Sequence, residues 1–155
     1  MGNAFIKGLS HSADNQIHVV EPISSVKAKL KDDFGVVVSN YDDPEKQMGE
    51  IVTLCDYVLI CVKPQVFNKI KETLKNLLSD NQIVISIMAG ISTENLCKGL
   101  GIKNAIRVMP NTPGQIGKGI SVWYKKNKID SKFEEGINNI LGTLGESEEV
   151  YEEEI

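Results

Sequence analysis

Residues 83–90, IVISIMAG, decide the fold class of this chain. They form an almost unbroken apolar run of strand length that ends in the turn Ala89-Gly90. Continuous apolar strands are typical of parallel sheets, because helices cover both faces of such a sheet. Residues 57–62, YVLICV, form a second run of this kind. The two runs therefore predict a parallel sheet in an α/β protein.

The rest of the chain alternates between strand and helix patterns around these runs. Short apolar or β-branched segments predict further strands at residues 17–20, 36–38, 105–109, 120–125 and 148–151. Apolar residues at helical spacing predict helices at residues 2–10, 24–34, 43–54, 66–78 and 130–144, and one more after Ser92. This alternation indicates an α/β, doubly wound, mostly parallel and Rossmann-like sheet.

Several residues mark the expected helix ends. Ser24 or Ser25 is expected to cap the helix of residues 24–34, and Gly35 is expected to stop it. Asp43 followed by Pro44 is a typical helix start, with the aspartate as N-cap and the proline in the first helical position.

Composition limits the function classes. The chain has 155 residues, the length of one domain, with 25% charged residues and a net charge of −4. An acidic balance argues against non-specific binding to nucleic acid or to an anionic membrane. No apolar run approaches the roughly 20 residues of a membrane-spanning helix, and no secretory leader is recognisable.

Cysteine usage predicts a reduced, cytoplasmic protein without a metal site. The three cysteines, Cys55, Cys61 and Cys97, are odd in number and lack zinc-ligand spacing. Cys61 lies in an apolar run and is expected to be a small core residue.

Four segments follow predicted strands. In open parallel sheets ligands bind at the carboxyl ends of the strands, so these segments should gather along one rim. The segments are Glu21; Cys61-Val62-Lys63-Pro64; Met88-Ala89-Gly90-Ile91-Ser92; and Met109-Pro110-Asn111-Thr112-Pro113-Gly114, where Asn111 and Thr112 lie between two prolines.

Each segment offers a chemical role. The Glu21 carboxylate can accept hydrogen bonds from ribose hydroxyls, and Lys63 offers a cation near a ribose or phosphate. Ala89-Gly90 would let a flat ring approach the backbone, because it has almost no side chain. A structural interpretation stays open for each segment alone: Lys63-Pro64 as a strand terminator and Ala89-Gly90 as an ordinary tight turn.

Three of these stretches, taken in order, resemble pyrroline-5-carboxylate reductase. They are CVKPQ at residues 61–65, ISIMAGIS at residues 85–92 and RVMPNTP at residues 107–113. The resemblance extends over nearly the whole chain. It implies an NAD(P)-binding domain that precedes a helical dimerisation domain, and hydride transfer to the cyclic imine pyrroline-5-carboxylate, which gives proline.

The resemblance also implies what this chain lacks. The family opens with a strand and Gly-x-Gly-x-x-Gly, and Gly2, preceded by Met1, would be the third glycine. The first strand and the C-terminal dimerisation domain of the family would be absent from a single truncated domain of residues 1–155. Residues 17–20 and 57–62 are then expected to pair directly or to recruit a strand from elsewhere, such as a second copy. A homo-oligomer stays open.

The cofactor is expected to be NAD or NADP. Glu21 should repel a 2′-phosphate and favours NAD, whereas Ser24, Ser25 and Lys27 lie close by and could bind one. The resemblance places the imine substrate near Asn111 and Thr112. No catalytic residue is identified, and surface or packing roles are expected for both histidines. Two alternatives remain: a truncated, non-catalytic nucleotide-binding or interaction module, and a related reductase with a different substrate.

Overall fold

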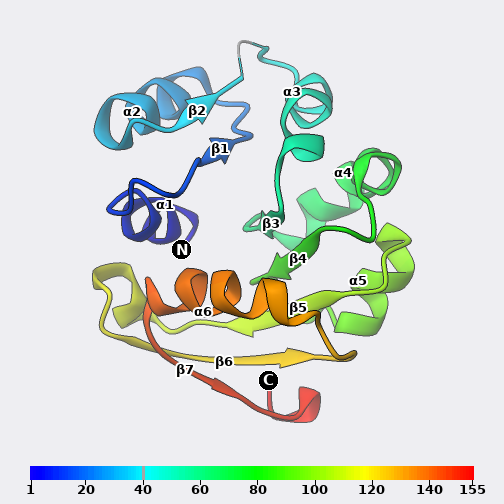
Figure 1. The fold of residues 1–155 in the computed structure, drawn as a ribbon. Helices are drawn as coiled ribbons and strands as arrows, with labels where there is room; N and C mark the ends of the chain where they lie inside the picture. Colours follow the sequence, from blue (N-terminus) through cyan, green and yellow to red (C-terminus); the bar gives the residue numbers. More distant parts are fainter. Residues whose placement is uncertain (40) are drawn as a thin grey trace.

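The structure is a computed structural model that describes residues 1–39 and 41–155. Figure 1 shows helices and strands that alternate along the chain. The α-helices are α1 (Gly2–Leu9), α2 (Ser24–Phe34), α3 (Pro44–Ile51), α4 (Pro64–Leu77), α5 (Thr93–Leu100) and α6 (Glu134–Gly142). The strands are β1 (His18–Val19), β2 (Val37–Val38), β3 (Tyr57–Ile60), β4 (Ile83–Ser86), β5 (Ala105–Met109), β6 (Gly119–Lys125) and β7 (Gly145–Glu149). Short 3-10 helices are Val52–Leu54, Thr112–Ile116, Ser131–Phe133 and Glu152–Glu154.

The strands form two sheets. One contains β1 and β2, which are parallel, and the other has the order β3-β4-β5-β6-β7. Strands β3, β4 and β5 are parallel, and β6 runs antiparallel to β5 and parallel to β7. The predicted α/β, doubly wound and mostly parallel architecture is confirmed.

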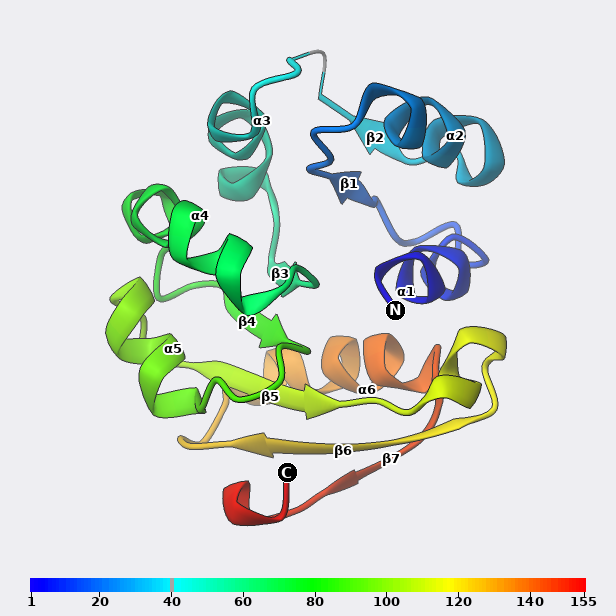
Figure 2. The ribbon, with the colours of Figure 1, turned by 180° about the vertical axis from the view of Figure 1, so that it is seen from behind.

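Helices cover both faces of the larger sheet, as seen in the opposite views of Figures 1 and 2. On one face, Phe5 of α1 and Leu141 of α6 pack against Ile85. On the other face, helices α3, α4 and α5 pack against Val84. All four residues of β4 are buried, because its alternating side chains enter a core on each side. The fold prediction from residues 83–90 rests on this double burial.

Two expectations about strands are wrong in detail. Direct pairing of residues 17–20 with residues 57–62 does not occur: among the described residues β1 pairs with β2, and β3 pairs with β4. Recruitment of a strand from a second copy stays a prediction. Strand β3 is therefore an edge strand and is only partly buried, whereas a fully buried strand was expected.

The expected helix-end residues Asp43 and Gly35 are confirmed, whereas the expected cap at the start of α2 is wrong. Asp43 accepts a hydrogen bond from the Lys46 amide, and Gly35 has the left-handed conformation (φ 63°) that ends α2. Neither Ser24 nor Ser25 caps α2, whose N-cap is Ile23. The Ser24 hydroxyl instead donates to Asp42, a residue that lies 18 positions further along the chain.

Candidate functional site

The N-terminal end of α1 is open to an anion. Met1 is its N-cap, no side chain in the described part of the chain caps it, and its first turn contains no acidic residue. Free amides and the helix dipole make such an end suitable for a phosphate. The helix is held in place by Phe5, which is only 2% exposed in the core. The uncapped end of α1 is therefore a rigid candidate phosphate site.

Gly2 brings this helix end against the end of β3. A Cβ atom on Gly2 would lie 3.3 Å from the Cβ of Cys61, so the close approach depends on glycine. This is the role that the third glycine of a dinucleotide fingerprint has, close packing of helix on strand. The Met1 methyl group lies beside Gly114, where an added Cβ would be 3.2 Å away. The structure therefore brings Met1, Gly2, Cys61 and the loop after β5 together.

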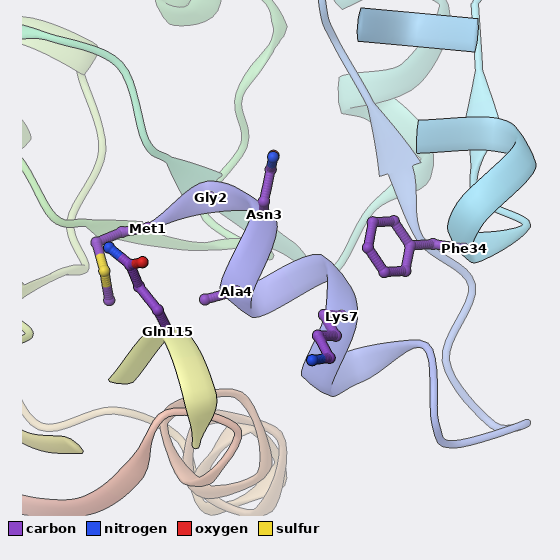
Figure 3. Close-up of a pocket in the computed structure, with 7 residues that line it drawn as sticks. All are labelled: Met1, Gly2, Asn3, Ala4, Lys7, Phe34 and Gln115. Atoms are coloured by element: carbon purple, nitrogen blue, oxygen red, sulfur yellow. The ribbon is translucent and has the colours of Figure 1, made fainter. Parts of the chain in front are cut away.

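A cavity of about 460 Å³ lies along α1. Figure 3 shows Met1 and Gln115 side by side at the start of the helix, with Phe34 across from it. The cavity is lined by Met1, Gly2, Asn3, Ala4, Lys7, Phe34 and Gln115. Sequence reasoning missed Asn3, Lys7 and Gln115. The four-residue spacing of Asn3 and Lys7 on one helix face was the signal available for those two.

The segment after β3 exposes its lysine. Lys63 is the N-cap of α4, its side chain is exposed, and Pro64 is the first residue of the helix. Val62 is half-buried. Cys61 is exposed, so its expected place in the core is wrong, since β3 ends at Ile60 and lies at the edge of its sheet. Nearby protein atoms still withdraw the thiol from water and raise its pKa to about 11.

The turn after β4 is open at its tip. Met88 is 2% exposed and belongs to the core, so only its backbone is available to a ligand. Its amide is held by the Ser86 hydroxyl at 3.2 Å. Ala89 and Gly90 are exposed, Gly90 has a φ of +74°, and no described atom lies within 4 Å of a Cβ built there. A flat ring therefore has room to approach this backbone.

The loop after β5 is locked by Asn111. Its side-chain oxygen accepts a hydrogen bond from the Ile120 amide at 3.0 Å, which ties the loop to β6. The amide nitrogen of Asn111 and the exposed Thr112 are what this loop offers to a ligand.

Glu21 lies in the loop after β1 of the smaller sheet and is held by a residue that sequence reasoning missed. The Gln47 side chain, 0% exposed, accepts from the Glu21 amide at 2.8 Å and donates to the Glu21 carbonyl at 3.2 Å. It also donates to the Tyr41 carbonyl at 2.8 Å. The Glu21 carboxylate accepts from the Ile23 amide at 2.9 Å. Gln47 thus joins the ends of β1 and β2.

The two histidines lie in the loop after α1 and in β1. His11 is exposed, with its Nδ1 atom 2.6 Å from the Lys7 carbonyl oxygen. His18 is half-buried in β1.

No helix within residues 1–39 and 41–155 has both the length and the apolar character needed to cross a membrane.

Comparison with known proteins agrees with this geometry. A pyrroline-5-carboxylate reductase from Corynebacterium melassecola is 31% identical to this chain over an alignment 164 residues long. The alignment covers 100% of this chain and 57% of that protein. The structure of a pyrroline-5-carboxylate reductase from Coxiella burnetii superposes with a TM-score of 0.84 and 25% identity, over 97% of this chain and 55% of that one. The fold is also shared with a Plasmodium falciparum pyrroline carboxylate reductase that has NADP bound, with a TM-score of 0.74 and 20% identity over 99% of this chain and 55% of that one.

The chain spans about half the length of the curated relatives it matches. The resemblance inferred from the strand-end motifs is confirmed by these matches, which extend over the whole chain. A family model described as "NADP oxidoreductase coenzyme F420-dependent" matches residues 1–90, which is more than half of the sequence and includes α1, β3 and the turn after β4. The chain therefore belongs to this family of NADP oxidoreductases.

Proposed function

We propose that this chain is the dinucleotide-binding part of a pyrroline-5-carboxylate reductase. The observation that carries the proposal is the uncapped start of α1, packed through Gly2 against the end of β3, in a chain similar over its whole length to reductases of that name. The bound cofactor, NADH or NADPH, supplies a hydride for the imine carbon of pyrroline-5-carboxylate while the ring nitrogen gains a proton, which gives proline.

The described residues divide the binding among them. The backbone amides at Gly2 face the pyrophosphate, and the exposed Lys63 adds a positive charge beside it. Glu21 accepts hydrogen bonds from the ribose hydroxyls. Ala89 and Gly90 leave space for the nicotinamide ring, because neither carries a side chain that would fill it.

Other residues complete the proposed site and its setting. Asn111 and Thr112 face the imine substrate. The cofactor wall between Lys63 and the Ala89-Gly90 turn is formed by Cys61, Val62, Pro64 and the backbone of Met88. The three cysteines are free in the structure, which supports a cytoplasmic location. A homo-oligomer remains part of the proposal.

A substitution at Ala89 tests binding of the nicotinamide half of the cofactor separately from binding of the adenosine half. Ala89→Leu places a branched side chain where the nicotinamide should lie, at an exposed position with ordinary backbone angles. We expect calorimetric titration to show at least tenfold weaker binding of NADH to this variant, since the leucine fills the space of the ring. A tenfold change corresponds to a loss of about 1.4 kcal/mol of binding free energy. Binding of 5′-AMP, which fills only the adenosine half, should be unchanged.

Ala28→Leu, at an exposed position on α2, is the matched control and should bind both ligands as the wild type does. Equal weakening of NADH and 5′-AMP by Ala89→Leu would contradict the placement of the nicotinamide. If the wild-type chain binds neither dinucleotide, the proposal itself is wrong and a non-catalytic interaction module is favoured. We expect negligible turnover of pyrroline-5-carboxylate by these 155 residues alone.

A further inference from the structure

The N-terminal end of α2 is occupied by two carboxylates from the chain itself. Glu21 accepts a hydrogen bond from the Ile23 amide at 2.9 Å. Asp42 accepts from the Ser24 hydroxyl at 3.3 Å and from the Lys27 ammonium at 3.0 Å. The first turn of α2 contains no acidic residue of its own, so both negative charges come from the loops that follow β1 and β2.

Lys27 donates two of its three ammonium hydrogen bonds within this arrangement. Besides the ion pair with Asp42, its ammonium donates to the Tyr41 carbonyl at 2.9 Å. Its side chain is only 12% exposed, whereas that of Asp42 is 77% exposed. The hydrogen bond and the positive charge of Lys27 lower the pKa of Asp42, so this carboxyl group is charged at neutral pH. Lys27 is therefore turned inward, and the carboxylate is what faces the solvent.

The pair is held by the fold. The buried Gln47 side chain bonds the backbone of Glu21 and the carbonyl of Tyr41, next to Asp42. Because β1 and β2 are parallel, the loops that carry Glu21 and Asp42 leave the small sheet at the same edge. That edge is where the proposed function places the adenosine ribose. A 2′-phosphate there would meet two carboxylates and a lysine that already donates two of its three hydrogen bonds to the chain.

We infer that Asp42 determines the choice between the two nicotinamide dinucleotides, and that it favours NADH over NADPH by holding Lys27 and Ser24 away from a 2′-phosphate. This inference rests on the proposed function. Lys27 is the lysine closest in sequence to Glu21, and a phosphate needs such a cation to offset its own charge. Loss of the Asp42 charge weakens the hold of this side chain on the Lys27 ammonium and the Ser24 hydroxyl, and removes one of the two repelling groups.

The test is the ratio of the two dissociation constants, measured by calorimetric titration of the 155-residue chain with NADH and NADPH. The wild type should bind NADH more tightly. Asp42→Asn keeps the shape of the side chain and should tighten NADPH relative to NADH by about tenfold, since one favourable charge contact is gained. The double variant Asp42→Asn/Lys27→Met should return toward the wild-type ratio, because the cation is gone.

Asp33→Asn removes the same charge from an exposed position of α2 and should leave the ratio unchanged. A loss of folding would weaken both dinucleotides together, so the ratio separates selectivity from damage. An unchanged ratio in Asp42→Asn, or a wild-type preference for NADPH, overturns the inference while the proposed function stands. A wild type that binds neither dinucleotide overturns both.

Discussion

Thr93 and Glu152, which are 59 positions apart, share two hydrogen bonds. One oxygen of the Glu152 carboxylate accepts from the Thr93 amide at 2.5 Å and from the Thr93 hydroxyl at 2.9 Å. Thr93 is the first residue of α5 and is 0% exposed, so its amide has no route to water. The C-terminal segment is thereby pinned to the start of a core helix, and Arg107 holds it again by donating to the Ile155 carbonyl at 2.9 Å.

The contact predicts that Glu152 matters for stability. Glu152→Ala should lower the free energy of unfolding by about 1–3 kcal/mol, because it leaves the buried amide and hydroxyl of Thr93 unpaired. Urea denaturation measures the change. Glu153→Ala, an exposed neighbour in the same 3-10 helix, should change stability by less than about 0.5 kcal/mol. Equal effects of the two substitutions would mean that the pairing with Thr93 contributes nothing.

Two helical glycines should respond to alanine with opposite signs. A Cβ on Gly8 would overlap the Thr143 side chain at the end of α6, so Gly8→Ala should destabilise the protein by about 1–3 kcal/mol. Gly49 lies in α3, and no described atom is within 4 Å of its would-be Cβ. Gly49→Ala should therefore stabilise by about 0.5–1 kcal/mol through helix propensity. Thermal and urea unfolding decide this, and changes of the same sign would contradict the packing of α1 on α6.

Cys61 should react slowly although it is exposed. With a pKa of about 11, the thiol is on the order of 0.1% thiolate at pH 8, and the thiolate is the reactive form. Iodoacetamide labelling at this site, followed by peptide mass spectrometry with Cys61→Ser as the blank, should accelerate about tenfold per pH unit up to about pH 11. A rate that is already constant at pH 8 would contradict the raised pKa.

The raised pKa of Cys61 also predicts how stability changes with pH. Folding raises the pKa of this thiol from its ordinary value of 9.0 to about 11, so the protonated thiol is favoured in the folded state. The resulting contribution to the free energy of unfolding is complete below pH 9 and is lost as pH rises to about 11. In Cys61→Ser this part of the alkaline loss of stability should be absent.

The apolar pattern of the sequence predicted the fold well where a strand is buried on both faces. Residues 83–86 form β4, and both faces of this strand pack against a core, as an unbroken apolar run indicates. The run at residues 57–62 looks the same in sequence, yet β3 is an edge strand, because exposure there depends on which strand lies beside it. The start of α2 was mispredicted for a similar reason, since the Ser24 hydroxyl donates to Asp42 through a contact that no local motif signals.

The sequence predicted which loops form the site but not the hydrogen bonds that hold those loops in place. Glycine and proline after each strand pointed to the segments that contain Lys63, Gly90 and Asn111. Gln47 was missed, since a glutamine within a helical pattern is usually exposed to solvent, and here it is 0% exposed. Its partners lie in two other loops, so only the folded chain reveals it.

The short ladder between β1 and β2 contains two residue pairs and does not continue into the five-stranded sheet. The backbone hydrogen bonds of the two sheets are therefore separate, and side chains such as Val20 and Gln47 join the small sheet to the rest of the chain. A dinucleotide that touches Glu21 beside one sheet and Lys63 beside the other would act as a further cross-link between them. Its binding would then stabilise both sheets together against unfolding.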